Sequence, residues 1–138
     1  MERNGEMSQK KRLVLLELNE INFDAVKCYV NQGLSLPGFT KILNSHFFTT
    51  QAETEYEQLE PWIQWPSIHT GKTFSEHKIF RLGDIVDYPK DQLFERIEGA
   101  GFKVGAVSPM NASNKLTSPA YFIPDPWTDT PADSSFIS

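Results

Sequence analysis

A short and nearly uninterrupted apolar run near the start of the chain limits most strongly what this protein can fold into. Residues 12–18 read RLVLLEL. The run is too short for the core of a signal peptide or for a membrane span. A short continuous apolar run is instead typical of a fully buried strand. We therefore predict a first strand over residues 12–18, with polar residues Asn19 and Glu20 at its carboxyl end.

Helix signals follow this strand directly. We predict a helix that begins at Phe23, is capped by Asn22 and stops at Gly33. A second, short helix opens at Pro37, because proline suits the first position of a helix. Residues 46–51, HFFTTQ, have high β propensity and predict another strand. This order is the opening of a βαβ unit.

The same alternation continues in the second half of the chain. The predicted elements are, in order, a helix over residues 61–70 bent at Pro66 and ended by Gly71, a long connection over 71–87, a helix over 89–100 and a strand over 102–107. Residues 108–138 show no strong periodicity. Alternating strands and helices predict an α/β fold with a mostly parallel sheet flanked by helices. We predict a flexible tail over residues 1–11 and one domain over residues 12–138.

Composition narrows the classes of function. The chain has 138 residues and a net charge of −5, without a basic patch, so nucleic-acid binding is not expected. Its only cysteine, Cys28, excludes an internal disulfide and a cysteine-rich metal site. No apolar stretch is long enough to predict a membrane span. These features predict a cytoplasmic protein, and they leave its oligomeric state open.

Several segments together resemble a known family. They are LVLLELNEINFDAV followed by LPGFTKIL, then WPSIHTGKTFSEHKIF, then GAGFKVGAV. Their order and spacing over residues 12–110 are similar to the opening of proteins of the alkaline phosphatase superfamily, which includes type I phosphodiesterase/nucleotide pyrophosphatases and sulfatases. The resemblance implies an alkaline phosphatase-like core, of which this chain is the N-terminal part. It also implies a metal-dependent hydrolase acting on a small-molecule phosphate, phosphodiester or related ester, with zinc as the expected divalent metal.

The resemblance implies a metal ligand at the end of the first strand. In the family this strand ends in a metal-binding aspartate, and that position falls on Asn19 in this chain. An asparagine offers an amide oxygen to a metal but no negative charge. Glu17 and Glu20 flank it and offer carboxylates. We therefore predict Glu17 and Asn19 as metal ligands.

The resemblance also implies a reacting centre at the start of the helix over residues 61–70. The family's nucleophile position falls on Pro61, which carries no nucleophilic atom, and Glu60 precedes it. We predict Glu60 as a metal ligand or as the base for a water nucleophile. Gln64 falls where some phosphodiesterase relatives carry an asparagine that steadies the phosphoryl oxygens. Glu60 and Gln64 are therefore the predicted catalytic residues.

Each of these residues also has a structural interpretation. Glu17 is a charge in an apolar strand and needs a partner, and Glu60 is a favourable acid at a helix start. For Trp62 and Trp65 packing is the more frequent role of an aromatic side chain. The two histidines of this region, His69 and His77, are predicted to be buried and satisfied by hydrogen bonds. The hydroxyls of Ser67 and Thr70 have no clear base nearby.

Two other functions remain as alternatives. Because the family's aspartate and nucleophile are both replaced, the chain is also consistent with a non-catalytic relative that keeps the fold for binding or scaffolding. Residues 66–73, PSIHTGKT, resemble a P-loop of pattern GxxxxGK[ST], but Pro66 replaces the first glycine and no apolar strand precedes it.

The chain has three histidines, too few for a two-metal site. The remaining ligands are expected beyond residue 138.

Overall fold

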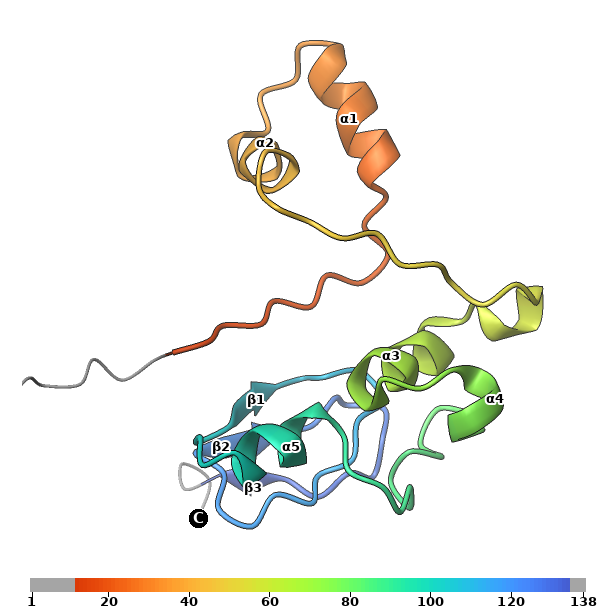
Figure 1. Ribbon diagram of the computed structural model, residues 1–138, viewed down its shortest axis with the longest axis vertical. Coiled ribbons are helices and arrows are strands. Elements are labelled where there is room, and N and C mark those ends of the chain that lie inside the picture. The colour runs from red at the N-terminus through yellow and green to blue at the C-terminus, as the bar shows by residue number, and fades with distance from the viewer. Residues whose placement is uncertain (1–11, 135–138) are drawn as a thin grey trace, which may run out of the picture.

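The structure is a computed structural model that describes residues 12–134, and its architecture is mixed α/β (Figure 1). The helices are α1 (Phe23–Asn31), α2 (Pro37–Leu43), the 3-10 turn η1 (Tyr56–Gln58), α3 (Pro61–Thr70), α4 (Phe74–His77) and α5 (Leu93–Gly99). The strands are β1 (Gly105–Val107), β2 (Tyr121–Ile123) and β3 (Asp133–Ser134). Helices α1 and α2 lie apart from the other elements, joined to them by two extended segments (Figure 1).

The three strands form one small sheet in the order β1-β2-β3. β1 and β2 are parallel, with Ala106 facing Phe122, and β3 is antiparallel to β2. In β1 and β2 only the middle residue is buried, as the two-residue period of a strand requires. The predicted parallel sheet is thus present as one parallel pair.

The main core lies between this sheet and α5. Phe94 of α5 meets Phe122 of β2 edge to face, with ring centroids 5.7 Å apart, and Phe122 is fully buried. The cluster is completed by Val104, Ala106, Ala112 and Leu116. A second, smaller cluster holds Ile79, Ile85 and Tyr88. The predicted helix over 89–100 starts later than expected, at Leu93, where the Glu95 side chain accepts a 2.8 Å hydrogen bond from the N–H of Gln92.

Helix α3 forms over the predicted residues 61–70. Gly71 ends it in the left-handed conformation, with φ 66°. Pro66 has no N–H to give to the carbonyl oxygen of Trp62 one turn earlier. That oxygen instead accepts a hydrogen bond of 2.6 Å from the Asn111 side chain. A residue of a distant loop therefore satisfies the helix where its own sequence interrupts it.

The two strands predicted in the first half of the chain are wrong. Residues 12–18 and 46–51 are extended but belong to no strand among the described residues. Their side chains are largely exposed: Val14 is 89% and Phe48 98% accessible. A strand requires a partner, and neither segment has one within residues 12–134. The apolar pattern therefore predicted the extended backbone but not the pairing.

The remaining predictions have mixed outcomes. The two helices after residue 22 are confirmed, with the Asn22 side chain accepting hydrogen bonds from the N–H groups of Asp24 and Ala25. The strand predicted over residues 102–107 is shorter and begins at Gly105. Short α4 lies within the predicted connection, and residues 108–134 contain β2 and β3.

The predicted tail, residues 1–11, lies outside the described residues. In the described part of the chain, every helix is too short and polar to cross a membrane.

Candidate functional site

The end of the first extended segment lies against α3. Oε1 of Glu17 is 2.9 Å from Nε2 of His69, and Oδ1 of Asn19 accepts a 2.9 Å hydrogen bond from the indole of Trp65. His69 and Trp65 are one helical turn apart on the same face of α3. Since Glu17 meets the later residue and Asn19 the earlier one, the segment runs along α3 towards the start of that helix. Of the predicted metal ligands, Glu17 and Asn19 therefore lie next to each other along α3.

His69 is the buried centre of this contact. Its side chain is fully buried. The ring stacks on Trp65, with centroids 5.8 Å apart, and packs at a tilt against Phe94, with centroids 5.2 Å apart. Its Nδ1 has no hydrogen-bond partner among the described residues. The prediction that His69 is buried is confirmed. Of its two ring nitrogens, however, only Nε2 has a hydrogen-bond partner among the described residues. The prediction of packing for Trp65 agrees with its stack on His69.

The other two predicted site residues lie in the first turn of α3. Glu60 is its N-cap residue, with an exposed side chain that makes no capping hydrogen bond. The amide of Gln64 donates to the carbonyl oxygen of Leu59 at 3.0 Å. No hydrogen bond joins either residue to Glu17 or Asn19 within the described chain. The structure thus places the four residues along one helix without joining them into one cluster.

A metal centre is not assembled in the part of the chain that the structure describes. No three side chains of His, Cys, Asp or Glu lie close enough together there to hold a metal ion. Glu17 and His69 make only a pair. One oxygen of Glu17 and the oxygen of Asn19 are also engaged by α3. Metal binding at these residues remains a prediction, and further ligands are needed to complete it.

A serine and a histidine do approach each other in this region, but their hydrogen bonds oppose nucleophilic catalysis. Ser67 Oγ lies 2.9 Å from Nε2 of His77. Nδ1 of His77 accepts the N–H of Ile79 at 2.9 Å, so in the neutral ring Nε2 carries the proton. Burial lowers the pKa of His77, which favours this neutral form. Nε2 therefore donates to the serine and cannot act as its base.

The P-loop-like residues are not a phosphate loop. Residues 66–70 are the last turns of α3 rather than a glycine-rich bend. The ammonium of Lys72 lies 3.0 Å from the carboxylate of Glu76, which forms a capping box with Thr73 at the start of α4. The hydrogen bond from the Thr73 N–H, with help from Lys72, lowers the pKa of Glu76 to about 2. These residues start α4 and have a structural role.

A buried polar cluster follows β1 and was not predicted from the sequence. Asn111 is fully buried and has a left-handed backbone, with φ 47°. Its Oδ1 accepts the N–H of Gly83, and its own N–H donates to Asp125 at 2.7 Å. In the sequence, Asn111 is a polar residue shortly after the predicted strand over 102–107, whereas Asp125 follows no predicted element. The only local signal for Asp125 was the turn that it forms with the N–H of Trp127.

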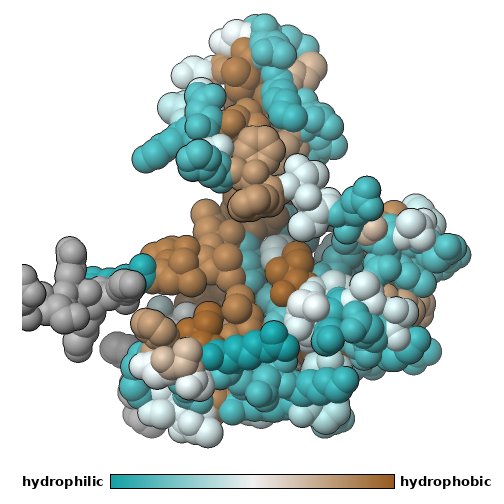
Figure 2. Space-filling model, viewed as in Figure 1, coloured by the Kyte–Doolittle hydropathy of each residue, from teal (hydrophilic) through white to brown (hydrophobic). Residues whose placement is uncertain are grey.

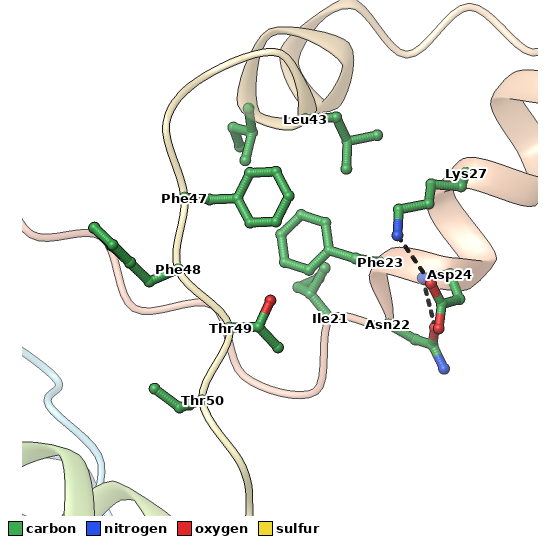
Figure 3. Close-up of a pocket in the computed structure, with 11 residues that line it drawn as sticks. Ile21, Asn22, Phe23, Asp24, Lys27, Leu43, Phe47, Phe48, Thr49 and Thr50 are labelled. Carbon is green, nitrogen blue, oxygen red and sulfur yellow. Dashed lines mark hydrogen bonds and ion pairs between the residues drawn. The ribbon is translucent and has the colours of Figure 1, made fainter.

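A hollow of about 560 Å³ lies elsewhere, between the start of α1 and the extended segment before η1 (Figure 3). Its lining is mostly apolar and includes Phe23, Leu43 and Phe47. The charged side chains in it, Lys27 and Asp24, pair with each other at 3.1 Å. It contains none of the predicted catalytic or metal-binding residues. The hollow therefore offers apolar surface rather than a reacting group.

Comparison with known proteins gives no assignment: no family model, no curated protein and no solved structure matches this chain. The class of protein that the structure itself defines is a mixed α/β protein. Its candidate site is the strip where residues 17–19 lie along α3.

Proposed function

We propose that this chain is the N-terminal part of a metal-dependent hydrolase-like protein that acts on a phosphate, phosphodiester or related ester. One observation carries the proposal: Glu17 and Asn19 lie along α3 and lead towards the helix start that bears Glu60 and Gln64. The resemblance in sequence requires this neighbourhood between the end of the first extended segment and the helix. An alkaline phosphatase-like core is part of the same proposal.

The chemistry of the strip fits a phosphate ester in two respects. The start of a helix carries a partial positive charge, which favours a phosphoryl group near the first turn of α3. Carboxylate and amide oxygens, as in Glu17, Asn19 and Glu60, are hard ligands that suit a divalent cation. The site would hold zinc through these oxygens together with ligands from further residues. The metal would polarise the ester oxygen and activate water.

Metal binding to the purified chain tests this proposal. Titration calorimetry with Zn²⁺ should detect a weak site, and Asn19→Asp should tighten it at least tenfold because it adds a charge at the ligand position. Glu17→Gln should weaken the site by a similar factor. Asn44→Asp is the matched control, because it adds the same charge at the exposed end of α2. The metal proposal is abandoned if Asn19→Asp and Asn44→Asp bind zinc equally.

One observation favours a second function, a non-catalytic relative that binds or scaffolds. One oxygen of Glu17 and the oxygen of Asn19 are already paired with His69 and Trp65, as expected of residues that only fix the position of α3. Under this alternative, Glu17→Gln and Asn19→Asp leave zinc binding unchanged. Hydrolysis of bis-p-nitrophenyl phosphate in the presence of zinc then stays at the uncatalysed rate for every variant.

A further inference from the structure

The position of Glu17 depends on very few contacts. The main chain of residues 12–18 makes no hydrogen bond within the described part of the chain. The apolar side chains before Glu17 are exposed, Leu13 by 81% and Val14 by 89%, and they form an apolar strip on the surface (Figure 2). Backbone pairing and apolar burial therefore contribute little to placing the segment. Glu17 is placed by its own contact with His69 and by the neighbouring contact of Asn19.

His69 holds the carboxylate of Glu17 by one oxygen only. Nε2 of the histidine lies 2.9 Å from Oε1, whereas Oε2 makes no hydrogen bond or ion pair with any residue that the structure describes. An ionised carboxylate can only accept hydrogen bonds, so Nε2 is the donor. The histidine side chain is fully buried, and that of Glu17 is one-fifth exposed. The histidine thus binds the carboxylate from the core and leaves Oε2 without a partner among these residues.

The ring of His69 can orient a carboxylate because the ring itself is fixed by packing. It lies against two aromatic side chains, Trp65 of its own helix and Phe94 of α5. Phe94 in turn meets Phe122 edge to face in the main core, where Phe122 is fully buried. The direction in which Nε2 points is therefore set by the packing of α3 and α5 on the sheet.

The histidine carries a polar cost that packing alone would not require. Its second nitrogen, Nδ1, is buried without a hydrogen-bond partner among the described residues. An apolar side chain would fill the same place between Trp65 and Phe94 without leaving such a group unpaired. Buried polar groups that break this rule are expected mainly at functional or strained sites. This favours a role for the Nε2–H of His69 beyond packing.

We propose that His69 is a positioning residue of the proposed metal site: it holds Oε1 of Glu17 so that Oε2 is presented to the cation. This role rests on the proposed function. Residues that hydrogen-bond a metal ligand fix its orientation and strengthen metal binding. Trp65 acts on Asn19 in the same way, through the 2.9 Å hydrogen bond from its indole. Because an amide oxygen has two lone pairs, Asn19 can accept this bond and still bind a cation.

Titration calorimetry with Zn²⁺ tests the role of His69. The variants are made in the Asn19→Asp chain, whose added charge tightens the site enough to measure a loss. His69→Leu removes the Nε2–H and should weaken zinc binding by about 10–100-fold, the usual effect of losing a residue that orients a ligand. His69→Gln should bind zinc more tightly than His69→Leu, because its side-chain amide can still donate to Glu17. Urea denaturation of each variant confirms that it is folded.

Thr70→Val is the matched control for lost stability at the end of α3. It removes a buried hydroxyl that donates to the carbonyl oxygen of Pro66 at 2.6 Å, and it should leave zinc binding unchanged. An equal loss of affinity in Thr70→Val and His69→Leu would overturn the positioning role. So would a His69→Leu variant that binds zinc as tightly as its parent, or a His69→Gln variant that binds no better than His69→Leu.

Two further results separate this role from the proposed function. If Asn19→Asp binds zinc no better than Asn44→Asp, the proposed function fails and the positioning role fails with it. If Asn19→Asp binds zinc specifically and His69→Leu does not weaken it, only the positioning role is overturned. Nitrogen-15 NMR of the zinc-free wild type gives a readout without metal: His69 should carry a proton on Nε2. A ring protonated on Nδ1 alone has no proton to donate to Glu17 and would overturn the role.

Discussion

The carboxylate of Glu17 lies 2.9 Å from Nε2 of His69, although 52 positions separate the two residues. Together with the bond between Asn19 and Trp65, this contact joins the N-terminal extended segment to α3. The histidine is fully buried, whereas the carboxylate remains one-fifth exposed. Removing the carboxylate would leave the buried Nε2 without its partner. This contact is therefore expected to contribute to the stability of the fold as well as to the site.

Glu17→Ala should lower the free energy of unfolding by about 1–3 kcal/mol, the usual cost of leaving a buried polar group unpaired. Urea denaturation followed by tryptophan fluorescence measures the change, because Trp65 stacks on His69. Glu20→Ala is the control, since Glu20 is exposed and makes no hydrogen bond to a described residue. Equal stabilities of Glu17→Ala and Glu20→Ala would show that the contact does not stabilise the fold in solution.

The contact between Ser67 and His77 is expected to be structural. Ser67→Ala should destabilise the protein by ~1–3 kcal/mol, because it leaves the buried Nε2–H of His77 without an acceptor. A fluorophosphonate probe, which labels activated serines, should not react with the wild type. The probe adduct is read by intact-mass spectrometry, with Ser75→Ala, an exposed hydroxyl on α4, as the control variant. Labelling that disappears only in Ser67→Ala would show that the serine is activated after all.

The pH dependence of stability should carry a contribution from His77. Burial lowers its pKa in the folded state below the ordinary 6.5, so the unfolded chain binds its proton first as the pH falls. Stability from this residue is thus complete above about pH 6.5 and is lost as the pH drops towards the folded pKa. Urea midpoints at pH 7.5 and 5.5 should differ for the wild type and differ less for His77→Gln.

Glu98 provides an internal control for the pH dependence that is assigned to His77. Hydrogen bonds from the N–H groups of Thr117 and Ser118 lower the pKa of Glu98 below its ordinary 4.5. Its contribution is present above that value and is lost only as the pH falls below it. Glu98→Gln should therefore leave the difference between pH 7.5 and 5.5 unchanged. If it removes that difference as fully as His77→Gln does, the assignment to His77 is wrong.

Asn111 is expected to be the most sensitive polar position of the described fold. Asn111→Ala leaves the carbonyl oxygen of Trp62 and the N–H of Gly83 without partners. It also places an alanine, which has no polar side chain, in the left-handed backbone conformation at φ 47°. We expect a loss of ~2–4 kcal/mol in the free energy of unfolding. Asn114→Ala, which removes a more accessible asparagine from the same loop, should cost less. Thermal or urea unfolding compares the two variants.

Local sequence was enough to place most helices. Asn22 and Gly33 delimit α1, Pro37 opens α2, and Pro61 and Gly71 bracket α3, because caps and stops act within a few residues. The predicted start of α5 was wrong by a few residues, since the residue before the helix is Gln92, whose side chain makes no capping hydrogen bond. β2 and β3 were hard to predict from the sequence, because both are very short, β2 has a single buried side chain and Asp133 of β3 is exposed.

In the candidate site, too, the sequence predicted some features and the tertiary structure decided others. Glu17, Asn19, Glu60 and Gln64 were identified in the sequence, but their partners were not. That His69 faces Glu17 and Trp65 faces Asn19 depends on how the N-terminal segment lies against α3, over a separation of about fifty residues. The role of Asn111 likewise depends on the missing N–H of Pro66, which lies in another element. Contacts of this range have no local signature.

The sequence by itself determined the helices with their ends and the extended character of residues 12–18, since backbone preference and hydrophobic pattern are local properties. Only the tertiary structure decided that residues 12–18 lack a strand partner within the described chain, that His77 donates to Ser67, and that a distant asparagine completes α3. The physical reason is that a strand, a tautomer and a buried polar group are each defined by the partner that meets them.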